Sequence, residues 1–222
     1  MTVKNPLLNE RAAGLLAARA LGCRRGRRLL FRGVDLELAP GSITWLRGTN
    51  GSGKTSLMRI LAGLAHAAEG EVQWNGRPFA KAGAEARAGV LYIGHANALK
   101  DDLTLTEALA FHAALAGLDD PTGRAERALA TLKLADRRRF AVRTLSQGQR
   151  RRGALARLAL DEQPRTWILD EPFDALDSAS VALLAGLVDA HAARGGAVLL
   201  TSHQAIPLAA AREFDLERWR VE

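Results

Sequence analysis

The stretch from Gly48 to Thr55 constrains the fold of this 222-residue chain more than any other part, because it reads G-T-N-G-S-G-K-T. It matches the phosphate-binding pattern G-x-x-x-x-G-K-[ST]. Residue frequencies alone would produce that match in a chain of this length with a probability of about one per cent. Residues 42–46 before it are typical of a buried strand, and residues 56–62 after it are typical of a helix. A strand, a glycine-rich loop and a helix in this order predict a nucleotide-binding α/β protein.

The chemistry of such a loop explains its composition. Glycines let successive backbone N–H groups point inward at phosphates, and the helix N-terminus adds partial positive charge. Lys54 is predicted to reach the β- and γ-phosphates, and the Thr55 hydroxyl to ligate Mg²⁺. An ordinary glycine-rich turn would explain the loop but not its flanking strand and helix. The predicted phosphate-binding residues are Gly48, Thr49, Asn50, Gly51, Ser52, Gly53, Lys54, Thr55 and Ser56.

Two acidic residues, Asp170 and Glu171, follow the apolar residues 167–169. A strand buried in a parallel sheet is apolar throughout, and ligands bind at its carboxyl end. Asp170 is predicted to hold Mg²⁺ through its water shell, and Glu171 to polarise the water that attacks the γ-phosphate. A solvated strand end before a turn at Pro172 is the simpler alternative, and the phosphate loop argues against it.

The sequence L-S-Q-G-Q at residues 145–149 precedes a helix predicted to run from about residue 149 to 160. Ser146 is placed at or near the N-cap, and Gly148 allows a close backbone approach. A helix N-terminus with a hydroxyl is an anion site. By itself the pattern could be a capped helix and nothing more. In a chain that already has a phosphate loop, it is most useful if it completes the site of a second molecule.

The order of G-T-N-G-S-G-K-T, L-S-Q-G-Q, W-I-L-D-E-P, D-A-L-D and T-S-H strongly resembles the ATP-binding cassette of ABC transporters. The resemblance covers nearly the whole chain, roughly residues 21–203. It implies a homodimer that buries two ATP molecules, with Ser146 and Gly148 contacting the γ-phosphate bound by the other protomer. It also implies that Asp177 communicates across the dimer. His203 would touch the γ-phosphate and help to orient Glu171 and water.

Two positions depart from the family pattern. The family usually places a glutamine after the strand at residues 90–93, where it ligates magnesium, and this chain has His95 there. Histidine is a poorer partner for Mg²⁺ than an oxygen ligand, although it can still ligate or donate a hydrogen bond. The family also stacks an aromatic side chain on adenine, where this chain has Arg25. A planar guanidinium can stack in its place.

The segment at residues 92–104, with the run L-S-Q-G-Q-R-R-R and the short C-terminus, resembles the heme-exporter ATPases of bacterial cytochrome c maturation. This resemblance implies an integral membrane partner of the CcmB type and a peripheral position on the cytoplasmic face of the inner membrane. The ATPase of another small exporter is the alternative. A cassette acting on nucleic acid or the ribosome would carry a second cassette or a coiled-coil insertion. A module that only binds ATP would lack Glu171.

The amino-acid composition limits the classes of partner that this chain can bind. With 48% hydrophobic and 25% charged residues the chain is typical of a globular protein, and its single cysteine, Cys23, excludes an internal disulfide. The net charge of +7 is compatible with nucleic acid, lipid headgroups or solubility. Because aromatic residues are only 5% and do not interleave with the arginines, we expect no nucleic-acid partner. Residues 1–10 lack the pattern of a targeting segment, and charged residues interrupt the apolar stretch 181–200.

We therefore expect one ABC ATPase domain over residues 1–222, with its core at about 12–95 and 143–222. The fold class is α/β: a mostly parallel sheet, an antiparallel β edge from residues near 15–46 and 72–74, and a helical subdomain inserted at about 96–142. In that insert Leu105, Leu109, His112 and Leu115 fall on one helical face, and Leu129, Leu132 and Leu134 follow. This arm is expected to meet the membrane subunit.

Overall fold

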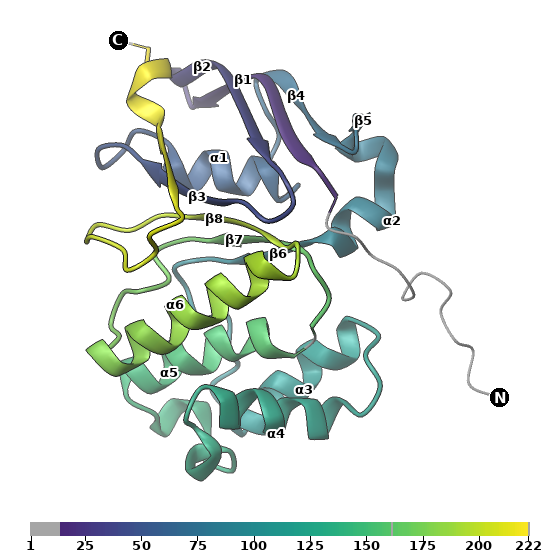
Figure 1. Ribbon diagram of the computed structural model, residues 1–222, viewed down its shortest axis with the longest axis vertical. Helices are drawn as coiled ribbons and strands as arrows, with labels where there is room; N and C mark the ends of the chain where they lie inside the picture. Colours follow the sequence, from purple (N-terminus) through teal and green to yellow (C-terminus); the bar gives the residue numbers. More distant parts are fainter. Residues whose placement is uncertain (1–13, 161, 222) are drawn as a thin grey trace, which may run out of the picture.

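A computed structural model describes residues 14–160 and 162–221 and arranges them around two β-sheets (Figure 1). The central sheet has the strand order β6-β7-β8-β3-β9, and all of its paired neighbours are parallel. Every residue of β7 and β8 is buried, as expected for strands covered on both faces. The strands are β3 (Ile43–Arg47), β6 (Val90–Ile93), β7 (Thr166–Leu169), β8 (Ala197–Leu200) and β9 (Arg212–Asp215).

The second sheet is antiparallel, with the order β2-β1-β4-β5. It consists of β1 (Leu16–Arg25), β2 (Arg28–Leu38), β4 (Glu69–Trp74) and β5 (Arg77–Pro78). The prediction of an antiparallel edge from about 15–46 was wrong for its last part, because β3 lies in the parallel sheet between β8 and β9. Four of the five residues of β3 are buried or half-buried, which suits the interior of a covered sheet rather than an edge.

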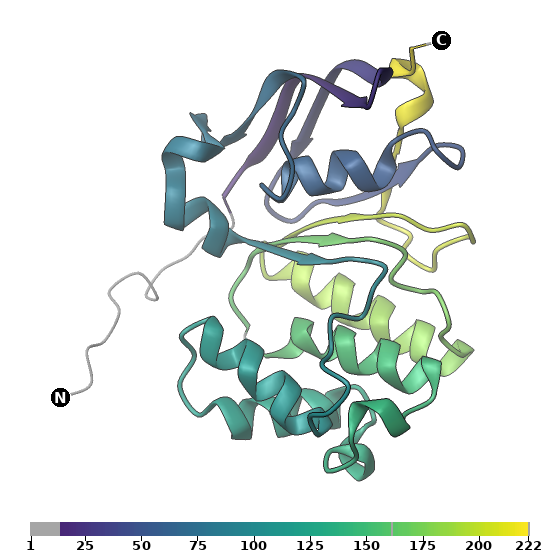
Figure 2. The same ribbon diagram turned by 180° about the vertical axis from the view of Figure 1, so that it is seen from behind.

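Helix α1 (Lys54–Leu61) lies between the two sheets (Figures 1 and 2). Its buried side chains belong to the same hydrophobic cluster as residues of β1, β2, β7 and β8, so the helix after the phosphate loop joins both sheets. Helix α2 (Phe79–Gly89) packs beside the antiparallel sheet and has a non-helical residue at Gly83. Helix α6 (Ser178–Ala193) covers the other face of the parallel sheet.

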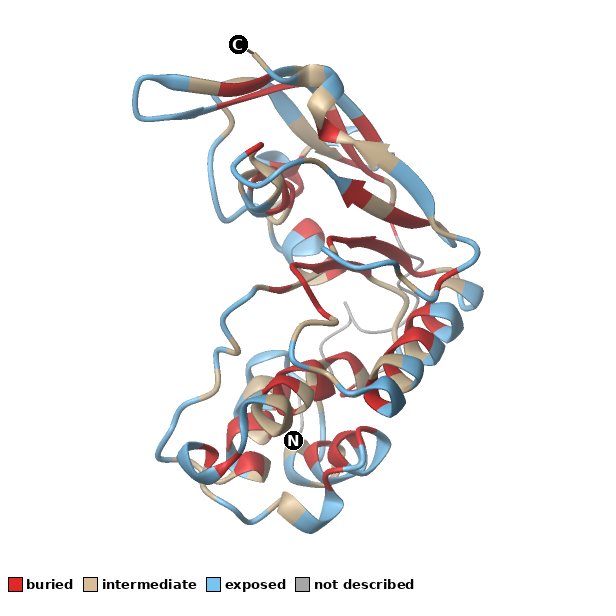
Figure 3. Ribbon diagram, turned by 90° about the vertical axis from the view of Figure 1, so that its left-hand side faces the viewer, coloured by how far each residue is buried: buried red, intermediate tan, exposed pale blue. Residues whose placement is uncertain are grey.

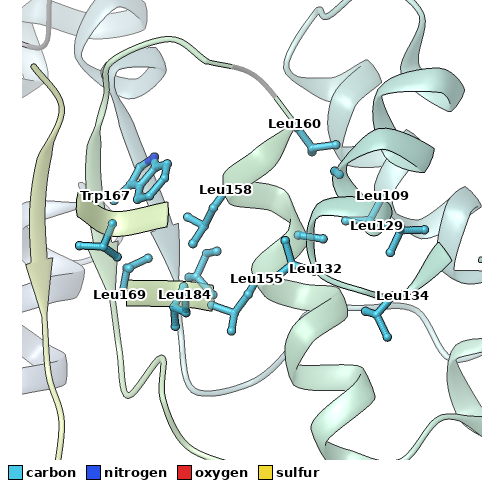
Figure 4. Close-up of a cluster of buried hydrophobic side chains, with 14 of the residues drawn as sticks. Leu109, Leu129, Leu132, Leu134, Leu155, Leu158, Leu160, Trp167, Leu169 and Leu184 are labelled. Atoms are coloured by element: carbon cyan, nitrogen blue, oxygen red, sulfur yellow. The ribbon is translucent and has the colours of Figure 1, made fainter. Parts of the chain in front are cut away.

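The remaining helices lie on the same side of the parallel sheet as α6, and α5 contacts the end of β7 directly: α3 (Leu105–Leu115), α4 (Pro121–Thr131) and α5 (Gln147–Leu155). Short 3₁₀ turns cover Ala135–Arg137, Val142–Thr144 and Ala156–Ala159. In Figure 4, Leu155 of α5, Leu158 of the following turn and Leu184 of α6 lie nearest to Trp167 and Leu169 of β7, and leucines of α3 and α4 extend the same cluster. Because α3 and α4 share this core with α5 and the sheet, the boundaries of a separate subdomain at 96–142 stay a prediction. In Figure 3 the buried residues follow the strands and the inner sides of these helices.

Two details of the helices differ from the expectation. Leu115 is 70% exposed, although its spacing placed it with the buried Leu105 and Leu109. It is the last residue of α3, where the chain turns away and no longer covers that side. Helix α5 starts within the L-S-Q-G-Q sequence at residues 145–149, which we call the signature sequence. It begins at Gln147, earlier than predicted, and ends at Leu155 before a 3₁₀ turn.

The prediction of an α/β cassette fold is confirmed. The expectation about a targeting segment at residues 1–10 lies outside the described residues, as do residues 12 and 13 of the predicted core. Within the described part of the chain, no helix combines the length and the apolar character that crossing a bilayer requires.

Candidate functional site

The phosphate loop connects the end of β3 to α1. Gly48, Gly51 and Gly53 have φ angles of 147°, 82° and 104°, which side-chain-bearing residues rarely adopt. Gly53 is the N-cap of α1, and no side chain among the described residues caps this helix. Lys54 Nζ donates to the carbonyl oxygens of Gly48 at 2.7 Å and Thr49 at 3.2 Å, so its ammonium group lies across the loop. The first turn of α1 thus presents N–H groups and one cation to an anion.

The acidic strand end meets this loop. Thr55 Oγ1 donates to Asp170 Oδ2 at 2.9 Å, which joins the start of α1 to the end of β7. The other carboxylate oxygen, Oδ1, accepts from Thr201 Oγ1 at 3.0 Å. Thr201 Oγ1 in turn accepts from the backbone N–H of Glu171 at 2.8 Å. Asp170 is therefore fixed at both oxygens, and one buried threonine connects it to Glu171.

Glu171 points toward His203, which follows β8. Its Oε2 accepts from the backbone N–H of His203 at 3.1 Å, and its Oε1 lies 3.4 Å from His203 Nε2. Glu171 is 8% exposed, and this burial raises the pKa of its carboxyl group, while the neighbouring His203 opposes the rise. A carboxylate with a raised pKa beside a phosphate loop can accept a proton from water more readily than an ordinary one.

One cleft of about 340 Å³ collects side chains that lie far apart in the sequence. The predicted residues that line it are Arg25, Asn50, Gly51, Gly53, Lys54, Thr55, Ser56, His95, Asp170, Glu171 and His203. Arg25 therefore reaches the cleft from the end of β1, and His95 from the loop after β6. Gly48 and Thr49 line a neighbouring cleft of about 640 Å³, whereas Ser52 is buried beneath the loop.

The signature residues lie outside both of these clefts. Ser146 is the N-cap of α5 in a capping box: it accepts from Gln149 N, and Gln149 Oε1 accepts from Ser146 N. A Cβ atom on Gly148 would lie 2.9 Å from the carbonyl oxygen of Ala175, so glycine permits the close approach there. Asp177 is the N-cap of α6 and accepts from Ser180 N at 2.8 Å.

The donor set at the acidic end suits a hard cation. Thr55 and Asp170 offer oxygen atoms, which Mg²⁺ prefers, and their side chains already contact each other. His95 Nδ1 lies 4.0 Å from Asp174 Oδ2, so its ring also faces a carboxylate. Within residues 14–160 and 162–221, no three His, Cys, Asp or Glu side chains gather as a metal-binding group. A magnesium ion here would take most of its ligands from phosphates and water.

Comparison with known proteins now assigns the family. The model of the ABC transporter family matches residues 31–174. The cytochrome c biogenesis ATP-binding export protein CcmA of Aromatoleum aromaticum is 51% identical over 195 residues, covering 88% of this chain and 91% of the relative. The chain belongs to the CcmA family of ABC transporter ATP-binding proteins.

Other relatives agree with this assignment. CcmA of Haemophilus influenzae is 40% identical, covering 93% of this chain and 97% of the relative. A solved ABC transporter ATP-binding protein from Pyrococcus furiosus superposes with a TM-score of 0.80 at 21% identity, over 93% of this chain and all of that one, and so supports the fold alone. A second structure, the ATP-binding subunit of an ABC transporter, gives a TM-score of 0.76 at 27% identity, covering 85% and 79%. The predicted resemblance to the ABC ATPases, and within them to the cytochrome c exporters, is confirmed.

Three residues of this CcmA-family cassette contribute to the site without having been predicted. Thr201 could have been suspected as a polar residue at the carboxyl end of a buried strand. Glu217, in the 3₁₀ turn Leu216–Trp219, accepts from Thr49 N at 2.7 Å and from Thr49 Oγ1 at 2.6 Å. These bonds lower the pKa of Glu217 to about 2. The third, Arg151, is a buried arginine of α5, and no local pattern indicates its partners.

Proposed function

We propose that this chain binds ATP with Mg²⁺ and hydrolyses it to ADP and phosphate, as one half of a homodimer that powers an exporter for cytochrome c biogenesis. The observation that supports this most strongly is the convergence of Lys54, Asp170, Glu171 and His203 on one cleft in a CcmA-family chain. The mixed set of a cationic phosphate loop and a buried carboxylate fits phosphoryl transfer to water.

Each residue has a separate role in this proposal. The phosphate-loop amides and Lys54 bind the phosphates, and Arg25 contacts the base. Thr55 and Asp170 would hold Mg²⁺, with His95 as a third candidate ligand, and the ion would neutralise charge on the phosphates. Glu171 orients the attacking water and accepts its proton, while the backbone N–H of His203 fixes the direction of that carboxylate.

The position of the signature residues supports the proposed homodimer. Ser146 and Gly148 begin a helix that suits an anion, yet they do not line the cleft that contains Lys54 and Glu171. Two chains facing each other would place this helix over the phosphates of the partner. In this arrangement each site takes residues from both protomers. Asp177, at the start of α6, would communicate between the two protomers.

The helical arm offers a surface for a membrane partner. Phe111 and Leu115 of α3 are 57% and 70% exposed, which is unusual for large apolar side chains so close together. Leu115 also lines a groove of about 240 Å³ with Leu118 and Leu158. We propose that an integral membrane subunit of the CcmB type docks here, which would hold the chain at the cytoplasmic face of the inner membrane. Hydrolysis would then drive the step that delivers heme to apocytochrome c.

A strain that carries Glu171→Gln in place of the wild-type chain tests this role. It should lose covalent heme on c-type cytochromes and retain its b-type cytochromes, because only c-type attachment needs the exporter. Heme staining of membrane proteins after denaturing electrophoresis measures the first, and difference spectra measure the second. Normal c-type staining would assign the chain to another small exporter. Its place among the ABC ATPases would not change.

A further inference from the structure

Arg151 is a buried charge whose shortest hydrogen bonds go to backbone carbonyl oxygens of other segments. It lies in α5, two residues after the signature sequence, and is 4% exposed. Its Nη1 donates to the carbonyl oxygen of Gly94 at 3.0 Å, and its Nη2 donates to those of Asp170 at 3.0 Å and Glu171 at 2.6 Å. No carboxylate of the described residues forms an ion pair with it.

Burying the Arg151 charge costs free energy, and its contacts show which segments the charge connects. Desolvation lowers the pKa of Arg151, although the nearby carboxylates of Asp174, Asp170 and Glu171 oppose the fall. Hydrogen bonds from its two Nη atoms offset part of this cost, while its buried Nε atom has no partner among the described residues. Here the planar guanidinium bonds two segments at once, the loop that leads to His95 and the end of β7. The compact ammonium group of a lysine could not reproduce this arrangement.

The backbone of Glu171 needs such support. Its φ angle is +48°, in the left-handed region that side-chain-bearing residues rarely adopt. On one side its N–H donates to Thr201 Oγ1, and on the other its carbonyl oxygen accepts from Arg151. These two bonds fix the peptide planes on both sides of its Cα atom. They therefore set the direction in which the Glu171 carboxylate points toward His203.

We propose that Arg151 is a positioning residue that couples the signature helix of a protomer to the catalytic carboxylate of the same protomer. The inference rests on the proposed dimer, in which Ser146 and Gly148 serve the ATP of the partner while Glu171 serves the chain's own ATP. Arg151 already links α5 to the backbone of Glu171 within one chain, so binding of α5 to the partner's γ-phosphate is transmitted through this link and holds Glu171 in its working direction. Each site thereby depends on whether the other is closed.

Mixed dimers test the direction of this coupling. Exporter complexes are assembled from two differently tagged full-length chains, one of which carries Glu171→Gln, so that a single site works. Arg151→Lys is then placed either in the protomer with the intact Glu171 or in the other one. We expect the first placement to lower kcat about tenfold or more with little change in KM, and the second to lower it less than about threefold.

Equal losses in the two placements would overturn the proposal, because a merely structural role in α5, or a general loss of folding, would affect both alike. Unchanged kcat in both would overturn it as well. Arg151→Gln, which can reach fewer carbonyl oxygens, should give the same asymmetry. Arg152→Lys is the matched control: its Nη1 donates at 3.4 Å to the carbonyl oxygens of Leu132 and Lys133, away from the cleft, and it should show no asymmetry. A wild-type complex that releases no phosphate would instead refute the proposed ATPase function itself.

Discussion

Helices α1 and α5 both begin at residues that the cassette pattern assigns to phosphate, yet their first turns are built differently. At α1, Gly53 occupies the N-cap in a left-handed conformation, no described side chain caps the helix, and Lys54 is the first helical residue. At α5, Ser146 and Gln149 form a capping box, in which the two residues bond each other's backbone N–H groups.

Under the proposed function, this difference corresponds to two kinds of anion site. The first turn of α1 keeps its N–H groups for a ligand and adds a cation beside them, so it suits phosphate binding by one chain alone. The capping box gives α5 a stable start without a ligand. It uses the N–H groups of Ser146 and Gln149, so the Ser146 hydroxyl proton and the first helical N–H groups can still be donated. It suits a site that is completed only when a second chain presents its nucleotide.

The largest effect should come from removing the proposed general base while leaving both helix termini intact. Glu171→Gln should lower phosphate release by about 10²–10⁴-fold, the usual contribution of a general base, and should leave the ATP affinity near that of the wild type. Steady-state phosphate release and equilibrium binding of labelled ATP measure the two quantities. Unchanged phosphate release would remove Glu171 from its role.

Removing the cation of α1 should act on binding itself. Lys54→Ala should weaken ATP binding to the isolated chain by about 10- to 100-fold, because a hydrogen bond to a charged group contributes about 1.5–3 kcal/mol. Equilibrium binding of labelled ATP is the measurement. Wild-type affinity in the variant would mean that the loop amides alone bind the phosphates.

Removing the cap of α5 should affect different properties from those that Lys54→Ala affects at α1. Ser146→Ala should leave the ATP affinity of the isolated chain within about twofold of wild type, and should lower the free energy of unfolding by about 1 kcal/mol, the usual contribution of an N-cap. Phosphate release by the dimer should fall by about tenfold, because a charge-assisted hydrogen bond to the partner's nucleotide is lost. Loss of ATP affinity in the isolated chain would contradict the division into two kinds of site.

The burial of Glu171 predicts a pH effect. Its raised pKa means that the carboxylate is protonated, and hydrolysis lost, at a higher pH than the 4.5 of an unperturbed glutamate would give. For stability the sign is the opposite of the usual acidic case: the folded state binds this proton more tightly than the unfolded state, so the contribution of Glu171 to folding increases as the pH falls through its folded pKa. Rate–pH profiles locate the acid limb of hydrolysis. A limb at or below 4.5 would show that burial does not control this group.

The smallest effect concerns recognition of the adenine base of the nucleotide. If phosphate contacts at α1 dominate and Arg25 stacks through its guanidinium, adenine should be recognised loosely, and GTP should compete with ATP within about a hundredfold, or about 2.7 kcal/mol. Competition binding measures the ratio, and Arg25→Tyr should increase the preference for ATP. A larger preference in the wild type would require specific base contacts elsewhere.

Much of the site could be read from the sequence because its parts are local. The glycines at 48, 51 and 53 allow the backbone of the loop, and the spacing of Ser146 and Gln149 is that of a capping box. The two acids after an apolar strand indicate the carboxyl edge of a parallel sheet. The family resemblance added the predicted roles of His203 and Asp177. The sequence patterns failed where the tertiary surroundings decide the outcome. Residue type does not show which sheet β3 joins, and helical period does not show that Leu115 is exposed.

The sequence by itself thus determined the family, the fold class and the segments that meet at the nucleotide, because each depends on residues that are adjacent along the chain. Only the tertiary structure decided how those segments are held together. Thr201 lies 30 residues from Glu171, and Glu217 lies 168 residues from the Thr49 to which it bonds. Threonine, glutamate and arginine can form many kinds of contact. Their partners are therefore chosen by the packing of the strands and helices, and no spacing along the sequence records that choice.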